Sequence, residues 1–393
     1  MLRPTVTPGG DALAFTDDYP WSMAMAQLTG GTAGGIPAFL AKGARALMKQ
    51  PWLGSQTFSP AHWANGDRVL VSSYGRVVKS GAQRSKPWQA LSYYDEDPTK
   101  TDWFKWHGLI WFDLEADFDV DTDALDYGQS LTKKNGAGTA AFGTSWGFIA
   151  TGDANISNVS PSFNPADDTL AYVATDYSAE WHPDALATVA DVRTVAYNHR
   201  AGGQSQPVEG ASSPDYLEFD PAFSPDGKLI AFTRAANGGP DGPFRHRFGE
   251  VTVVAASGGE PVRLLANDPN ACAGDAQPLT LLNGSAAWAP EAVKHGGRTY
   301  YFLVFTSARR YEDEFAASFE MSGPSYSNTL QDSTQLYVST IVVDDATGTI
   351  STFPAVYAWN QNRAAGGGAT QLSSLTPVWG NTRLPPLRIE PVP

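Results

Sequence analysis

The stretch Asp220–Ala235, DPAFSPDGKLIAFTRA, places a serine, an aspartate and a lysine close together, which suits either a reactive loop or a turn between strands. Ser224, Pro225 and Gly227 occupy the first, second and fourth positions of a type I turn, where these residue types are favoured. The segments on either side, DPAF and KLIAFTR, are rich in residues that fit strands. The stretch therefore predicts a hairpin whose turn is formed by Ser224–Gly227.

The same pattern, an apolar residue followed by any residue and a proline before a β-rich run, recurs along the chain. The prolines that align the copies are Pro8, Pro60, Pro165, Pro225 and Pro290, and a partial sixth copy is LTPVWGN at 375–381. The unit at 219–267 reads as four antiparallel strands. Because one such unit cannot bury both of its faces, the repetition predicts a β-propeller.

The FSPDGKLIAF unit resembles the TolB-like, WD40-like (PD40) repeat, which has an aromatic residue, Ser-Pro-Asp-Gly and then Ile-Ala-Phe. The match is closest at 221–233, good at 161–173 and degenerate in the other copies. The resemblance implies one all-β propeller domain over 1–393, with four-stranded antiparallel blades. It favours six blades, with five or seven as alternatives, and repeats that start near residues 4, 55, 160, 220, 285 and 375. It also implies a bacterial periplasmic or secreted protein, but no single function.

Two segments do not fit this repeat simply. The segment 37–51 has apolar residues at helical spacing between two prolines and predicts the one clear helix. No third or fourth strand is evident for the first copy within 17–53. The long interval before the third copy leaves room for a degenerate blade around 138–151.

Composition excludes several classes of protein. A net charge of −14 argues against a nucleic-acid partner, because phosphate binding needs clustered Lys and Arg. No apolar run is long enough to span a bilayer. The single cysteine, Cys272, excludes an internal disulfide. The first residues lack the apolar core of a signal peptide, as expected of a mature or trimmed chain.

The long segments after the second strands are 17–50, 74–106, 174–190, 235–249 and 308–334. In a propeller these connections share one face, called here the top face, with the connections between blades. Loop elaboration on one face of a rigid scaffold is typical of a binding site. Aromatic residues beside charged ones suit peptide or glycan recognition, although they could equally pack the inserts onto the blades. The predicted ligand-binding residues are Tyr93, Trp103, Trp106, His107, Asp176, Tyr177, Trp181, His182, Arg234, Arg245, His246, Arg309, Arg310 and Tyr311.

Catalysis and metal binding are the alternatives. Ser145 is the centre of a Gly-x-Ser-x-Gly match, but the strand-like residues after it do not suit a nucleophile elbow. Closely spaced aspartates in the acidic run 113–126 are compatible with Ca²⁺, or with a solvated acidic edge. The candidate calcium ligands are Asp117, Asp119, Asp121 and Asp123.

The function that these patterns favour is a non-catalytic binding or scaffold propeller that engages a protein, peptide or glycan through its top face. One alternative is a polysaccharide-active, metal-assisted lyase or hydrolase, with histidines such as His107, His182 and His246 converging in the central funnel of that face. Another is a propeller domain of a larger multidomain protein. The sequence gives no signal of oligomeric state.

Overall fold

The computed structural model describes the backbone of the strands between residues 2 and 133, and then residues 146–153, 156–176, 187–238, 246, 248–268, 282–307 and 335–358. Before residue 146, side chains are described only at Val69, Val71, Leu109 and Trp111. The partial sixth copy at 375–381 lies outside the described residues.

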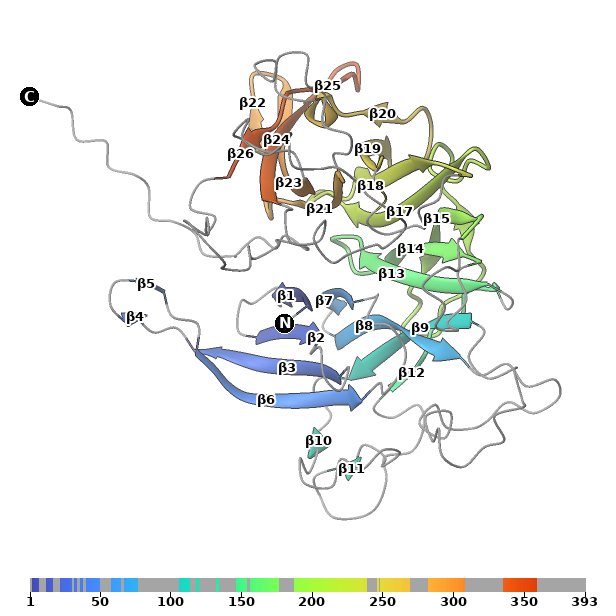
Figure 1. Ribbon diagram of the computed structural model, residues 1–393, viewed down its shortest axis with the longest axis vertical. Coiled ribbons are helices and arrows are strands. Elements are labelled where there is room, and N and C mark those ends of the chain that lie inside the picture. Colours follow the sequence, from blue (N-terminus) through green and yellow to red (C-terminus); the bar gives the residue numbers. More distant parts are fainter. Residues whose placement is uncertain are drawn as a thin grey trace, which may run out of the picture.

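The described strands form five successive antiparallel sheets with four strands in their main order, and these are the blades of a β-propeller. Figure 1 shows the sheets following one another along an arc, from blue blade 1 to orange-red blade 5. Blade 1 contains β1 (Leu2–Val6), β2 (Ala12–Thr16), β3 (Ser22–Thr29) and β6 (Leu40–Lys49); blade 2 contains β7 (Phe58–Ala64), β8 (Asp67–Arg76), β9 (Trp106–Asp113) and β12 (Trp146–Phe148). Blade 3 contains β13 (Ser157–Phe163), β14 (Thr169–Thr175), β15 (Ala190–Ala196) and β16 (Gln206–Pro207); blade 4 contains β17 (Tyr216–Phe223), β18 (Leu229–Ala236), β19 (Glu250–Ala255) and β20 (Val262–Arg263). Blade 5 contains β21 (Gly284–Trp288), β23 (Arg298–Ser307), β24 (Gln335–Asp344) and β25 (Ile350–Thr352), with β22 (Val293–His295) and β26 (Val356–Tyr357) paired to its central strands.

The short remaining elements lie in connections. Two small hairpins, β4 (Thr32–Ala33) with β5 (Ile36–Pro37) and β10 (Phe118–Asp119) with β11 (Thr132–Lys133), stand between the third and fourth strands of blades 1 and 2. A 3-10 turn, η3 (Leu265–Asn267), follows β20.

Two sequence predictions about these blades are wrong. Residues 40–49 form strand β6, not a helix, and pair with β3, so the segment 17–53 supplies the missing third and fourth strands of blade 1. Residues 40–49 have high helix propensity, but hydrogen-bonded pairing with a neighbouring strand outweighs it. Residues 146–148 pair with β9 as the outer strand of blade 2, so the described part of 138–151 does not form an extra blade.

The Ser-Pro-Asp-Gly turn is confirmed. The Gly227 N–H donates to the Ser224 carbonyl at 2.8 Å, and Gly227 has a φ of +72°. The buried Ser224 hydroxyl accepts the Leu229 N–H at 3.0 Å and donates to Asp226 at 2.8 Å. Both side chains therefore stabilise the turn.

The first, inner strand of each blade contains a bulge, in which two residues lie opposite one residue of the second strand. These bulges show how the repeats align with one another, and the alignment differs from the one predicted from the prolines. The pairing register shifts between Phe219 and Ala222 in β17, and Asp220, within the bulge, has a φ of +53°. In β7 the shift falls between Phe58 and Ala61, so Pro60 corresponds to Pro221 in the bulge and not to Pro225 in the turn. The bulge dipeptides are Arg3-Pro4, Ser59-Pro60, Ser160-Pro161, Asp220-Pro221 and Ser285-Ala286.

Apolar clusters fill the contacts between the blades with described side chains. Blades 3 and 4 bury Ala171 and Val192 against Ile230 and Phe232. Blades 4 and 5 share a larger cluster with Trp288 and five other large apolar side chains of blade 5; these five are Tyr301, Leu303, Phe305, Tyr337 and Ile341.

Backbone contacts at the outer rim hold neighbouring blades together. Gly210, which follows β16, has a φ of +85°, and a Cβ there would lie 2.0 Å from the Gly259 carbonyl oxygen of blade 4. The Gly259 N–H donates to the Glu209 carbonyl at 3.0 Å. Ala150 and Gly202 make the equivalent contact between blades 2 and 3. Glycine is required at positions where two backbones approach this closely.

Candidate ligand-binding end of the propeller

The antiparallel order of the blades defines two ends. Connections from second to third strands and from blade to blade lie on the top face, and the other turns lie on the bottom face. Four of the five predicted inserts are at the top face: residues 77–105, 176–189, 237–249 and 308–334 separate a second strand from a third.

The fifth prediction is wrong, because the segment 17–50 contains β3 and β6 and leaves only residues 17–21 between β2 and β3. Long connections between strands are also not confined to the top face. Residues 30–39 and 114–145 join third to fourth strands and belong to the bottom face.

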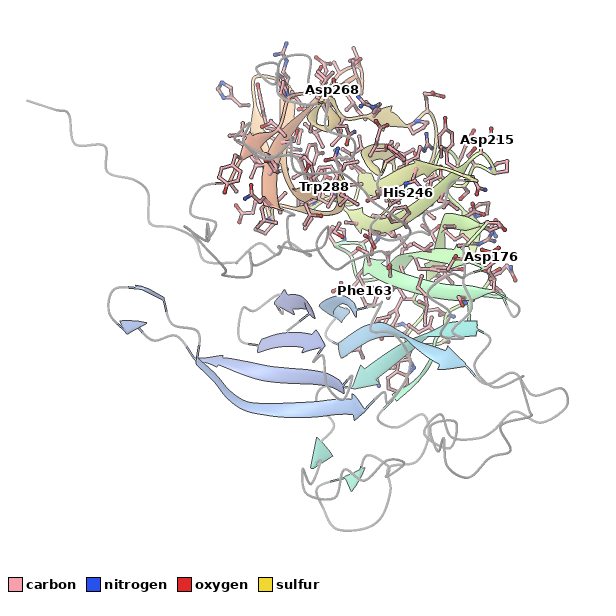
Figure 2. The ribbon with its side chains drawn as sticks, viewed as in Figure 1. Phe163, Asp176, Asp215, His246, Asp268 and Trp288 are labelled. Atoms are coloured by element: carbon pink, nitrogen blue, oxygen red, sulfur yellow. The ribbon has the colours of Figure 1, made fainter. Side chains whose placement is uncertain are left out.

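Asp176 closes the base of the blade 3 insert. Its carboxylate accepts the Thr188 N–H at 2.9 Å, the Val189 N–H at 3.0 Å and the Thr188 hydroxyl at 2.5 Å. Asn237, at the equivalent end of blade 4, donates to the Thr188 carbonyl at 2.7 Å and to the Pro214 carbonyl at 3.2 Å. These bonds tie the top connections of blades 3 and 4 together. Figure 2 shows Asp176 and Asp215 on the same side of the molecule.

Arg234 is held within the contact between blades 3 and 4. Its guanidinium donates to the fully buried Glu218 at 2.7 and 3.1 Å and also to the Gly210 carbonyl, and it lies 4.6 Å from the centre of the Tyr216 ring. The other Glu218 oxygen accepts the Ser213 N–H at 2.9 Å. Burial raises the pKa of Glu218 to about 7, while the Ser213 N–H and Arg234 act in the opposite direction. The pair therefore fixes the 210–213 connection to blade 4.

His246 lies just before β19 and is buried, with 2% of its surface exposed. Its Nδ1 accepts the Phe248 N–H at 3.1 Å, and its carbonyl accepts the Gly249 N–H at 2.9 Å. Phe248 is 57% exposed. The turn thus buries the imidazole and presents the neighbouring phenyl ring to solvent.

The other predicted site residues are not described beyond the backbone. Trp106 and His107 begin β9 and Asp119 ends β10, but their side chains are not described. The remaining candidates lie outside the described residues: Tyr93, Trp103, Tyr177, Trp181, His182, Arg245, Arg309, Arg310, Tyr311, Asp117, Asp121, Asp123 and Ser145. The acidic run is on the bottom-face connection 114–145, away from the top-face inserts. In the described part of the chain, no three His, Cys, Asp or Glu side chains gather as metal ligands would.

The sequence patterns did not single out two polar contacts between blades. One is the contact of Glu218 with the Ser213 N–H in the connection from blade 3, in which Glu218 is also bonded to its cross-strand partner Arg234. The other joins three bulge residues with positive φ: Asp220 accepts from the Ser285 hydroxyl at 3.1 Å and from the Ser160 hydroxyl at 3.5 Å. In the sequence, the recurrence of Ser or Asp directly before a proline is the pattern that could have predicted this second contact.

No protein-family model matches the chain, and no curated protein matches its sequence. Solved structures with a similar course of the chain include a TolB-type protein of Agrobacterium tumefaciens. It is 12% identical with a TM-score of 0.39, over 91% of this chain and 81% of that one. Hydrazine synthase of Kuenenia stuttgartiensis is also 12% identical with a TM-score of 0.37, over 90% and 83%. A puromycin-hydrolysing peptidase of Mycobacterium tuberculosis is 13% identical with a TM-score of 0.32, over 92% of this chain and 46% of that one.

These likenesses are too distant to carry a function to this chain. The propeller architecture rests on its own sheet order and repeats. No helix among the described residues is long and apolar enough to cross a membrane.

Proposed function

We propose that this propeller is a non-catalytic binding module whose top face engages a protein, peptide or glycan, in the bacterial periplasm or outside the cell. The observation that carries the proposal is the placement of four long connections at one end of rigid four-stranded blades. Binding sites are commonly built from loops that a scaffold holds in place.

The described contacts explain how the scaffold positions these connections. Asp176 and Asn237 fasten the ends of the inserts of blades 3 and 4, and the Glu218–Arg234 pair fastens the connection between the blades. Three predicted ligand-binding residues, Asp176, Arg234 and His246, are thus engaged within the protein itself. Recognition is assigned instead to exposed side chains such as Phe248 and to the aromatic residues of the inserts.

The localisation rests on the resemblance of the repeat to the TolB-like family. Fractionating cells that express the natural full-length gene tests it directly. Recovery in the periplasmic or culture-medium fraction is expected, and recovery only with a cytoplasmic marker would contradict it.

The binding function is tested by comparing the two ends of the propeller. Peptides from a display library and glycans from an array are selected on the full chain, and their affinities are remeasured on two variants. One variant replaces 308–334 with a Gly/Ser linker, and the matched control replaces 120–131 of the bottom-face connection. Loss of binding only in the first variant supports the proposal.

Equal binding by both variants would assign recognition elsewhere. The enzymatic alternative is tested on the same full chain, with acidic and neutral polysaccharides and added Ca²⁺ or Zn²⁺. New reducing or unsaturated ends would show that the protein is an enzyme and not a binding module.

A further inference from the structure

Asn237 and Gly238 form a turn at the top face, directly after β18. The Nδ2 group of Asn237 donates to the Thr188 carbonyl of blade 3 at 2.7 Å and to the Pro214 carbonyl of the connection between blades 3 and 4 at 3.2 Å. Its Oδ1 accepts the Gly238 N–H at 2.8 Å. These bonds hold the Asn237 carboxamide beside the backbone nitrogen of the next residue.

An Asn-Gly dipeptide has a reaction of its own. The backbone nitrogen of the glycine can attack the side-chain carbon Cγ of the asparagine, and glycine has no Cβ to hinder this approach. Holding a nucleophile close to the group that it attacks favours such a reaction. For this reason the combination is chemically labile, and asparagine counts among the thermolabile residues.

The surroundings of Gly238 leave room for this reaction. Gly238 is exposed, and apart from its chain neighbours no atom lies within 4 Å of the position that a Cβ would take. Asn237 itself is half-buried. Water and hydroxide ions therefore reach the peptide nitrogen between the two residues.

The other Asn-Gly dipeptide of the described residues has a different environment. Asn283 is 1% exposed, and its Nδ2 donates to the Asn267 Oδ1 at 3.2 Å. Gly284 belongs to β21 and pairs with Thr306 of β23. The same dipeptide is thus open to solvent at one site and enclosed in a blade at the other, which makes Asn283 an internal reference.

We propose that Asn237 is a site of spontaneous deamidation, and that its conversion breaks the link between the top-face connections of blades 3 and 4. A hydroxide ion takes the proton of the Gly238 N–H, and the nitrogen forms a bond to the Cγ of Asn237. The bond from Cγ to Nδ2 breaks, and ammonia leaves with a proton from water. A water molecule then opens the cyclic imide to aspartate or isoaspartate, with no change of oxidation state.

The product cannot keep the hydrogen bonds of the amide. An ionised carboxylate has no hydrogen to donate to the Thr188 and Pro214 carbonyls, and its negative charge would face their oxygen atoms. Both bonds that Asn237 makes to blade 3 and to the connection are therefore lost. The modification thus acts on the segments from which two of the long top-face inserts extend.

Peptide mass spectrometry of the folded full-length chain tests the modification. During incubation at mildly alkaline pH, Asn237 should convert faster than Asn283 by roughly tenfold or more, since reaction at the enclosed site requires local opening. In urea both sites should convert at similar rates. Conversion of Asn237 no faster than that of Asn283 in the folded chain would overturn the inference, and so would an equal difference between the sites in urea.

Hydrogen exchange of an Asn237→Asp variant tests the structural consequence. The amides of Thr188, Val189 and Tyr216, which are hydrogen-bonded at the top face, should exchange faster than in the wild type by roughly threefold to tenfold. Asn198→Asp adds the same charge to an exposed bottom-face turn and is the matched control, which should leave these amides unchanged. Wild-type exchange rates in Asn237→Asp would show that deamidation does not break the link.

Discussion

The contacts that blade 4 makes with its two neighbours differ in chemistry. Toward blade 3, a fully buried carboxylate and an arginine hold the connecting segment through backbone groups. Toward blade 5, aromatic packing dominates, with hydrogen bonds from Trp288, Tyr301 and the Ser285 hydroxyl. The polar contact fixes the path of a top-face connection, whereas large aromatic side chains fill the contact with blade 5. One blade can therefore fix a top-face connection through one face and pack against the next blade through the other.

The largest effect is expected from Trp288→Ala. Trp288 is 8% exposed and lies in the cluster between blades 4 and 5, where its ring meets Tyr301 edge to face at 5.7 Å between centroids. Its removal leaves a cavity and removes one hydrogen bond to the Ala222 carbonyl, so the free energy of unfolding should fall by about 3–5 kcal/mol. Chemical denaturation measures this. A loss below about 1 kcal/mol would mean that aromatic packing does not dominate this contact.

Gly210→Ala should be the next most destabilising change, at about 2–4 kcal/mol. The new Cβ meets the Gly259 carbonyl at 2.0 Å, and the residue must keep a positive φ. Gly203→Ala is the matched control, because a Cβ there has no neighbour within 4 Å and its φ is not positive. Thermal unfolding of both variants checks this, and equal melting temperatures would disprove the close rim contact.

Glu218→Gln tests the polar contact through its dependence on pH. The pKa of Glu218 rises on folding from 4.5 to about 7. The folded state thus binds this proton more tightly, and the contribution to stability is full below about pH 4.5 and is lost as the pH rises to about 7. The wild type should lose about 1–3 kcal/mol more than the variant between pH 5 and pH 8. Urea denaturation at each pH measures the free energies of unfolding. If these changed with pH by the same amount in the wild type and the variant, Glu218 would not titrate in this range.

Tyr301→Phe should have the smallest effect, about 1 kcal/mol. Burial acts to raise the pKa of Asp226, but hydrogen bonds from Tyr301, Ser224 and the Lys228 N–H hold it below its ordinary value. The variant removes one of these bonds, made at 2.7 Å, and leaves the ring packed. NMR titration should show the pKa of Asp226 moving upward. An unchanged pKa would mean that this bond is not formed in solution.

The sequence predicted what local chemistry determines. The Ser224–Gly227 turn and the strands on either side of it are confirmed, because proline, glycine and side-chain oxygens act within a few residues. The helix at 37–51 was wrong because pairing with β3 outweighs propensity, and Pro60 was misaligned because a bulge proline and a turn proline look alike in one sequence.

The candidate site was less predictable for a related reason. Asp176 and Arg234 looked available to a ligand, but Arg234 meets a glutamate 16 positions away on a neighbouring strand, and Asp176 binds the far end of its own insert. Contacts of this kind depend on register between strands, which a single sequence does not reveal. The predicted binding residues of the inserts and the calcium candidates stay predictions.

The proline of the inner-strand bulge has a consequence for self-association. The inner strand is an edge of its blade, and an exposed edge invites pairing with a strand of another chain. At four of the five bulges a proline removes the N–H that such pairing would use, and the bulge also interrupts the straight course of the strand. The central edges are thus protected against intermolecular strand addition during folding, before neighbouring blades enclose them.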